Sequence, residues 1–186
     1  IKTRTTIQDI YKKKLKEAIE KGFITDEDYK LMEEVIDDEG ETEDHIDHID
    51  MRYKLFTDTK IDNKSEPKFH QDCEKVNKAW MSVCEDSELL YLMAATAGIE
   101  DWYAPLSAFF EDEYRKRGFT EDELELFIVH KEADCDHSEA QFAILEKNKK
   151  HLDPEKLRQV VKRTFETSKA YDGLKKIFAE DSSKIL

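Results

Sequence analysis

The sequence predicts a single all-α domain over residues 1–186, built as a bundle of seven or eight helices. Two observations lead to this prediction. Apolar residues recur at the helical period along almost the whole chain, and only five glycines and three prolines occur in 186 residues. Folds with many β-turns use these two residue types more often. The length suits one domain and is sufficient to bury a substantial core.

The first two helices are delimited by local signals. The first is expected over about residues 7–19 and ends near Gly22, because glycine is favoured just after a helix C-terminus. Thr25 and Asp28 form a variant of the capping box with Asp in place of Glu. They predict the start of a second helix that continues to about Asp38.

The middle of the chain alternates apolar helical patterns with polar segments. A third helix is expected over about residues 45–56 and a fourth over about 69–83, with a polar loop over 58–67 between them. Ser87 is a typical N-cap residue, and it predicts the start of a strongly apolar fifth helix over about 89–103.

The C-terminal part is expected to hold two long helices. Pro105 kinks or restarts the fifth helix, and Gly118 closes the stretch that follows. Thr120 and Glu123 form a capping box that opens a long helix over about 120–150. Asp153 followed by Pro at the first helical position predicts a last helix, to about residue 179.

Composition limits the class of partner. The 44 acidic and 30 basic side chains give a net charge of −14, so neither nucleic acid nor an anionic membrane is an expected partner. No apolar run approaches the roughly 18 residues of a membrane span, and no signal-peptide pattern opens the chain. Cys73, Cys84 and Cys135 lack CxxC spacing, which disfavours a disulfide scaffold or thiolate zinc site. We therefore expect a cytoplasmic protein.

The most informative segment lies in the predicted helix 120–150. His130, Asp134 and His137 are spaced i, i+4, i+7, which places all three on one helix face. Phe127 and Gln141 extend this face, so the three polar residues interrupt an apolar stripe. Two imidazoles and a carboxylate suit a divalent metal such as iron, manganese or zinc. The alternative is a solvated face in a chain that is 40% charged.

A second candidate ligand lies in the fifth predicted helix. Leu89, Met93, Thr96, Glu100 and Tyr103 step by four or three residues, so Glu100 shares a face with expected core residues. A buried glutamate needs a cation partner. The alternative is that Glu100 lies exposed near the helix end, beside Asp101.

The acidic stretch before the third helix offers further ligands. Glu41 and His48 are seven residues apart, and so are Asp38 and His45. Carboxylates are so frequent here that such spacings arise readily by chance, and a solvated acidic loop is the alternative. Helical bundles nevertheless build dinuclear sites from carboxylates and His on several helices.

Together these segments resemble the heme-oxygenase-like diiron oxidases, a superfamily that includes the chlamydial protein associating with death domains. The resemblance covers about residues 22–180. It is carried by the HxxxDxxH of His130, Asp134 and His137, by Glu100 with a Pro shortly after it, and by His48 about fifty residues earlier. It implies a heme-oxygenase-like fold. It also implies a first carboxylate ligand at Glu41, Asp38 or Glu39, followed by His48, for which His45 is the alternative.

The resemblance implies a non-heme diiron oxidase or oxygenase, with two iron ions per chain (manganese being the alternative) that activate O₂. A small molecule such as an amino acid or a fatty acid would be oxidised or cleaved. Self-sacrificing chemistry is not implied, because Phe110 stands where that mechanism needs Lys. Expected walls of a dry pocket, with ordinary core packing as the alternative, are Met93, Trp102, Tyr103 and Phe127.

Two other classes of function stay open. One is a cofactorless or non-redox enzyme of the same fold, similar to thiaminase II. The other is a binding protein with a vestigial metal site. Self-association into a homodimer is also left open.

The spacing of the two central helices gives a geometric prediction. If the fifth helix continues past Pro105 to Arg117 and the chain turns at Gly118, Glu100 lies 17 residues before the turn. His137 lies 17 residues after Thr120, so each is about 26 Å from the turn at roughly 1.5 Å per residue. Antiparallel packing would then bring Glu100 level with His137.

Overall fold

The computed structural model describes residues 2–38 and 78–167, with side chains described over 8–36 and 78–167. All secondary structure in these ranges is helical, which confirms the all-α prediction. None of the helices seen there is both long and apolar enough to cross a membrane. The described elements are six α-helices and one short 3-10 helix: α1 (Lys2–Glu20), α2 (Asp26–Asp38), a helix over 78–86, α5 (Leu89–Lys116), α6 (Glu121–Asn148), η2 (Lys149–His151) and a helix over 154–167.

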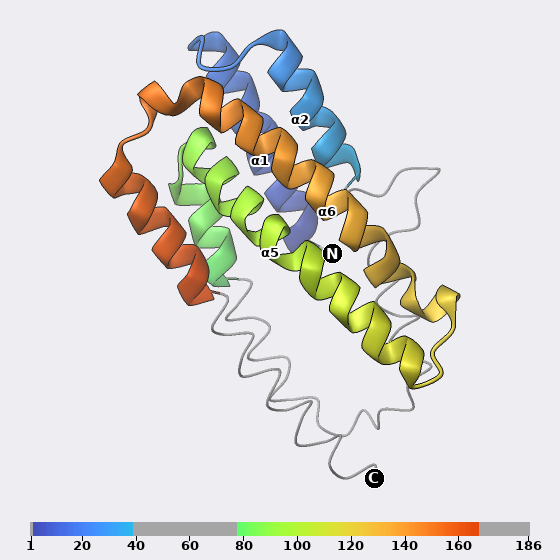
Figure 1. Ribbon diagram of the computed structural model, residues 1–186. Helices are drawn as coiled ribbons and strands as arrows, with labels where there is room; N and C mark the ends of the chain where they lie inside the picture. Colours follow the sequence, from blue (N-terminus) through green and yellow to red (C-terminus); the bar gives the residue numbers. More distant parts are fainter. Residues whose placement is uncertain (1, 39–77, 168–186) are drawn as a thin grey trace.

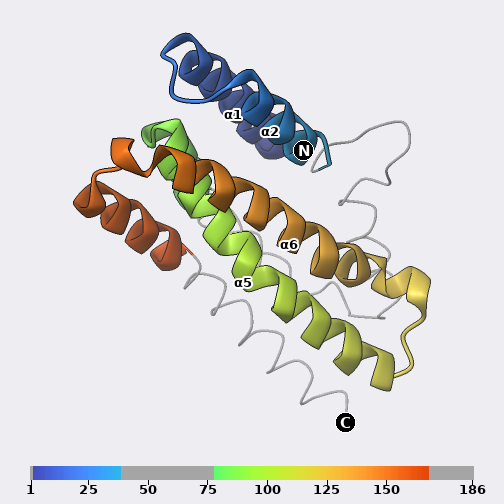
Figure 2. The ribbon, with the colours of Figure 1, turned by 45° about the horizontal axis from the view of Figure 1, so that its top comes forward.

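The centre of the fold is the antiparallel pair of α5 and α6, which lie side by side along their whole length (Figure 1). α1 and α2 pack together on one side of this pair, against the half that is far from the α5–α6 turn (Figure 2). The helix over 154–167 packs against α5, where Val160 joins Tyr91 and Ala95 in a small apolar cluster. The third helix and the loop expected over 45–67 lie outside the described residues.

Most helix ends follow the local signals in the sequence. Gly22 and Gly118 take φ values of 70° and 89°, the left-handed conformation that glycine adopts without strain. In the capping box of α2, the Asp28 amide donates to Thr25 Oγ1 (3.1 Å) and the Thr25 amide donates to Asp28 Oδ2 (3.2 Å). Thr120 forms the expected capping box at α6.

One capping prediction is wrong. The N-cap of α5 is Glu88 and not Ser87, and no side chain caps this end. The Ser87 amide still donates to Val83 of the preceding helix, so Ser87 closes that helix instead of opening the next. Lys14 of α1 binds the same junction, because its ammonium group donates to the carbonyl oxygens of Glu85 (3.0 Å) and Ser87 (2.5 Å).

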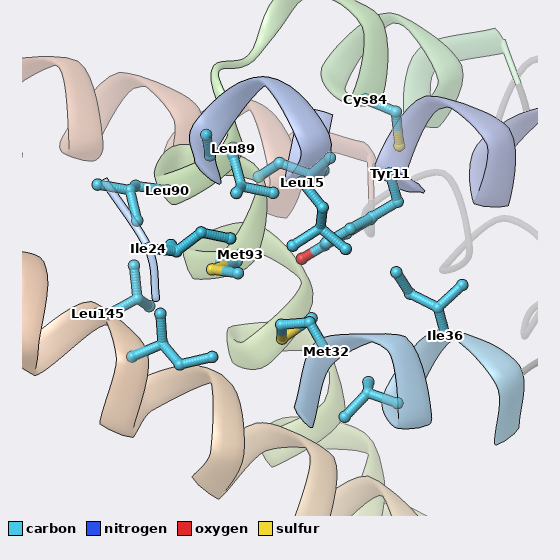
Figure 3. Packing of buried hydrophobic residues seen from close by; sticks show 14 residues of the cluster. Tyr11, Leu15, Ile24, Met32, Ile36, Cys84, Leu89, Leu90, Met93 and Leu145 are labelled. Carbon is cyan, nitrogen blue, oxygen red and sulfur yellow. The ribbon is translucent and has the colours of Figure 1, made fainter. Parts of the chain in front are cut away.

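The main core forms where α1 and α2 meet the α5–α6 pair. Leu15 of α1, Met32 of α2, Met93 of α5 and Ile144 of α6 are all essentially inaccessible to solvent. Figure 3 shows Met93 close to Leu15, Ile24 and Met32, and it shows Tyr11 reaching into the same cluster. Because every one of these helices contributes a fully buried side chain, the core fixes the position of α1 and α2 on the pair.

Candidate metal centre

The face of α6 that packs against α5 contains ionisable side chains in its middle. His130, Asp134 and His137 are 9%, 3% and 5% exposed, whereas their neighbour Asp136 is exposed. The expected i, i+4, i+7 face is therefore buried and not solvated. Burial of two imidazoles and a carboxylate in a helical core is unfavourable unless these groups are paired, hydrogen-bonded or bound to a cation.

The His130 ring has a defined orientation. Its Nδ1 lies 2.6 Å from the Leu126 carbonyl oxygen, one turn earlier in α6. A carbonyl oxygen only accepts, so Nδ1 carries the proton and donates, and the lone pair of the neutral ring lies on Nε2. A backbone carbonyl that fixes the tautomer in this way is typical of His ligands to metals.

One polar side-chain atom of Asp134 and one of His137 are deeply buried. Asp134 Oδ2 and His137 Nδ1 are inaccessible to solvent and accept or donate no hydrogen bond within the described part of the chain. The residues themselves are not isolated, because each takes part in a further interaction.

The side chain of Glu100, a residue of α5, contacts α6. It is partly buried, and its Oε2 accepts a hydrogen bond from Nε2 of Gln141 (2.5 Å). Gln141 lies four residues beyond His137 on the same face of α6. Glu100 thus lies about one helical turn away from the level of His137 at which the helix lengths predicted it. α5 reaches this arrangement because it continues through Pro105 as one helix.

A buried network holds this contact. The Tyr11 hydroxyl of α1 donates to Oε1 of Gln141 (3.1 Å) and lies 3.1 Å from Thr96 Oγ1. Thr96 also hydrogen-bonds Gln141 Oε1. Burial of the phenol raises the pKa of Tyr11 far above its ordinary value, although the hydrogen bond with Thr96 opposes this rise. Tyr11 therefore stays protonated and acts as a donor at every physiological pH.

A small residue of α5, Ser107, lies opposite the polar middle of α6. Ser107 is seven residues along α5 from Glu100, and Asp134 is seven residues back along α6 from Gln141. In an antiparallel pair, Ser107 and Asp134 are therefore level. Ser107 is fully buried, and its hydroxyl has no hydrogen-bond partner within the described ranges.

The four expected pocket residues have different environments. Met93 is buried in the main core, at the contact with α1 and α2. Phe127 is buried near the α5–α6 turn, where its ring stacks on Tyr114 with centroids 5.8 Å apart. Trp102 and Tyr103 are 45% and 36% exposed, so each presents a large part of its ring to solvent, and their role as pocket walls stays a prediction.

The remaining candidate ligands are not placed. Asp38 is the last residue of α2, and its side chain lies outside the described residues. Glu39, Glu41, His45 and His48 lie outside the described residues altogether. The choice between Asp38, Glu39 and Glu41, and between His45 and His48, thus stays as the sequence left it.

Within the described side chains, no group of three or more His, Cys, Asp and Glu residues is arranged closely enough to hold a metal ion. The four candidate ligands among the described residues, Glu100, His130, Asp134 and His137, therefore do not form a preassembled metal site by themselves. No protein-family model matches the chain, and no curated protein matches it.

Sequence reasoning missed the network that holds Glu100. The residue spacing places Gln141 on the α6 face and Thr96 on the α5 face, but it predicts no hydrogen bond between them. Tyr11 had no signal of its own, because a tyrosine on the apolar face of an amphipathic helix is ordinary core. Its role appears only when α1 packs on the pair.

Proposed function

We propose that the protein is an O₂-dependent non-heme iron oxidase or oxygenase whose metal centre lies between α5 and α6. The observation that supports this most is the buried His130–Asp134–His137 face of α6, with the Nδ1 proton of His130 directed to a backbone carbonyl. In the neutral ring this places the lone pair on Nε2, the atom that would bind the metal. The resemblance of the same residues to the heme-oxygenase-like diiron oxidases leads us to propose that fold and two irons per chain.

The donor chemistry fits iron. Imidazole nitrogen and carboxylate oxygen are the usual ligands of non-heme iron and also accept manganese or zinc. His130, Asp134, His137 and Glu100 would contribute two neutral and two anionic ligands, and the acidic segment around Glu41 and His48 would complete a dinuclear site. Iron in such a site supplies the reducing equivalents and the coordination positions that O₂ needs.

The residues of the chain would do the remaining work. Glu100 and Asp134 would neutralise the metal charge, and burial of the α6 face would keep water from the reacting centre. Phe127 and its aromatic neighbours close the end of the pair nearest the turn. We propose a small organic substrate, of which amino acids and fatty acids are the two classes that the resemblance suggests.

Anaerobic titration of the intact chain with Fe(II) tests the proposal, with Mn(II) as a redox-silent comparison. We expect about two irons per chain, a rise in melting temperature with either metal, and an absorbance transient when O₂ is admitted. Asp134→Asn should abolish most of the thermal shift, whereas Asp136→Asn, two residues away and exposed, should leave it intact. Glu100→Ala should likewise remove most of the shift.

A second matched pair uses histidine. His130→Ala should lower the iron content strongly, and His151→Ala should not, because His151 is exposed in η2. Equal iron content in the two variants would refute the assignment of the α6 face. Metal binding without an O₂-dependent transient would favour a vestigial site, and the absence of binding would favour a cofactorless enzyme.

A further inference from the structure

We infer that Gln141 is a positioning residue that orients the Glu100 carboxylate towards α6, and that Tyr11 couples this orientation to the docking of α1. The inference rests on the proposed function, because it assigns a role in metal binding to residues that are not themselves expected ligands. It identifies α1, which carries no candidate ligand among its described side chains, as a determinant of metal affinity.

The donors and acceptors around Gln141 fix its side-chain amide in one orientation. An ionised carboxylate only accepts, so the nitrogen of Gln141 must face Glu100 (2.5 Å), and Oε1 must face the two hydroxyl groups. Tyr11 and Thr96 both hydrogen-bond that oxygen. Rotation of the amide by 180° would set Oε1 of Gln141 against Oε2 of Glu100, two acceptors, and the hydrogen bond to Glu100 would be lost. The network therefore admits one arrangement.

Burial makes this arrangement strong. Gln141 is 1% exposed and Tyr11 is 6% exposed, so water has little access to the Gln141 amide and to the Tyr11 hydroxyl. Loss of a buried partner leaves a polar atom unsatisfied, which costs more than the bond itself contributes. Glu100 is thereby held against α6, one helical turn from His137, instead of turning outward with its neighbour Asp101.

Tyr11 belongs to a different layer of the fold from the other residues of the network. Tyr11 lies on α1, 130 residues before Gln141. It reaches the α5–α6 seam only when α1 is docked through Leu15 and its neighbours in the core. Docking of α1 and correct placement of Glu100 are therefore linked, and linkage is reciprocal: a metal that needs Glu100 in place must also stabilise docked α1.

The test compares two tyrosines. Both Tyr11 and Tyr91 are buried, and both use their hydroxyl groups in a long-range hydrogen bond, because Tyr91 accepts from the Asp153 amide (2.9 Å). Mn(II) affinity is measured for wild type, Gln141→Met, Tyr11→Phe and Tyr91→Phe. Gln141→Met should weaken binding about 10–100-fold, the range for outer partners of metal ligands. Tyr11→Phe should fall at the lower end of that range, and Tyr91→Phe should match wild type.

Hydrogen exchange supplies the reciprocal measurement. Mn(II) should slow exchange of the α1 amides in wild type and in Tyr91→Phe, but much less in Tyr11→Phe. Equal effects of the two tyrosine variants on affinity and on α1 exchange would overturn the inference, because both hydroxyls would then have only a structural role.

A failure of the proposed function can be distinguished from a failure of this inference. If wild type binds neither Mn(II) nor Fe(II), the metal centre is refuted, and the link between α1 and metal falls with it. The positioning of Glu100 is then decided without metal: Gln141→Met and Tyr11→Phe should accelerate amide exchange around Glu100 in α5 more than Tyr91→Phe does. Equal exchange in the three variants would overturn that part as well.

Discussion

The seam between α5 and α6 buries two kinds of surface, and their chemistry is opposite. Far from the turn, Leu92, Met93 and Ile144 are fully buried and pack against α1 and α2. In the middle, Asp134 and His137 are almost as deeply buried, although they are polar and ionisable. Apolar burial stabilises the fold, whereas burial of ionisable groups opposes it. The apolar end therefore stabilises the fold, whereas the polar middle lowers its stability unless its ionisable groups are paired or bound to a cation, as we propose.

The largest expected effect lies at the apolar end. Leu92→Ala should lower the free energy of unfolding by about 2–5 kcal/mol, because the side chain is fully buried and its removal leaves a cavity. Denaturant unfolding of the metal-free chain measures this loss. Leu31→Ala is the control, since Leu31 of α2 is 37% exposed and the same substitution should cost far less there. Similar losses at both positions would contradict the core assignment.

A smaller effect is expected where α2 meets α6. Asp28 is 2% exposed, closes the capping box of α2 and accepts from Lys147 Nζ of α6 (2.8 Å). Burial by itself would raise the pKa of Asp28, but hydrogen bonds from Lys147 and Thr25 outweigh it and hold the pKa below its ordinary value. Asp28→Ala should cost about 1–3 kcal/mol at pH 7, measured by denaturant unfolding.

The pH dependence of the same group has a definite sign. Because the folded-state pKa of Asp28 is lowered, its contribution to stability is present above the unfolded-state pKa of about 3.9 and is lost as the pH falls through the folded-state pKa. Acidification should thus destabilise wild type more than Asp28→Ala. Glu123→Ala, in the exposed capping box of α6, is the control and should cost less at pH 7.

The smallest expected effect has the opposite sign. Ser107→Ala should raise the stability of the metal-free chain by about 1 kcal/mol, because it removes a fully buried hydroxyl that has no hydrogen-bond partner among the described residues. Ser138→Ala is the matched control: Ser138 is equally buried, but its hydroxyl donates to the Cys135 carbonyl (2.9 Å), so its loss should destabilise. Thermal unfolding of both variants sharpens the contrast between the two parts of the seam.

The local features of this seam could be predicted from the sequence. The i, i+4, i+7 spacing placed His130, Asp134 and His137 on one buried face, and residue counting from Gly118 brought Glu100 close to their level. Such predictions depend only on helical geometry within one hairpin. The prediction that Ser87 caps α5 was wrong, because the preceding helix ends at Ser87 and the Ser87 amide donates to Val83 of that helix.

Features that depend on packing between distant segments could not be predicted. Tyr11 is a partner of Gln141 only because α1 docks on the α5–α6 pair, and no periodicity in α1 encodes that contact. The exposure of Trp102 and Tyr103 likewise depends on which sides of α5 other segments cover. Local sequence patterns contain no such information.

The separation of 130 residues between Tyr11 and Gln141 also has a consequence for biosynthesis. At about 5–20 residues per second, the ribosome makes Gln141 roughly 6–26 s after Tyr11. Until the helix over 78–86, α5 and α6 have been made, α2 is the only described helix that can cover the apolar face of α1, with Leu15 and Ala18. The newly made α1–α2 hairpin is therefore the segment of the nascent chain on which we expect chaperones to act, until α5 and α6 emerge and close the core.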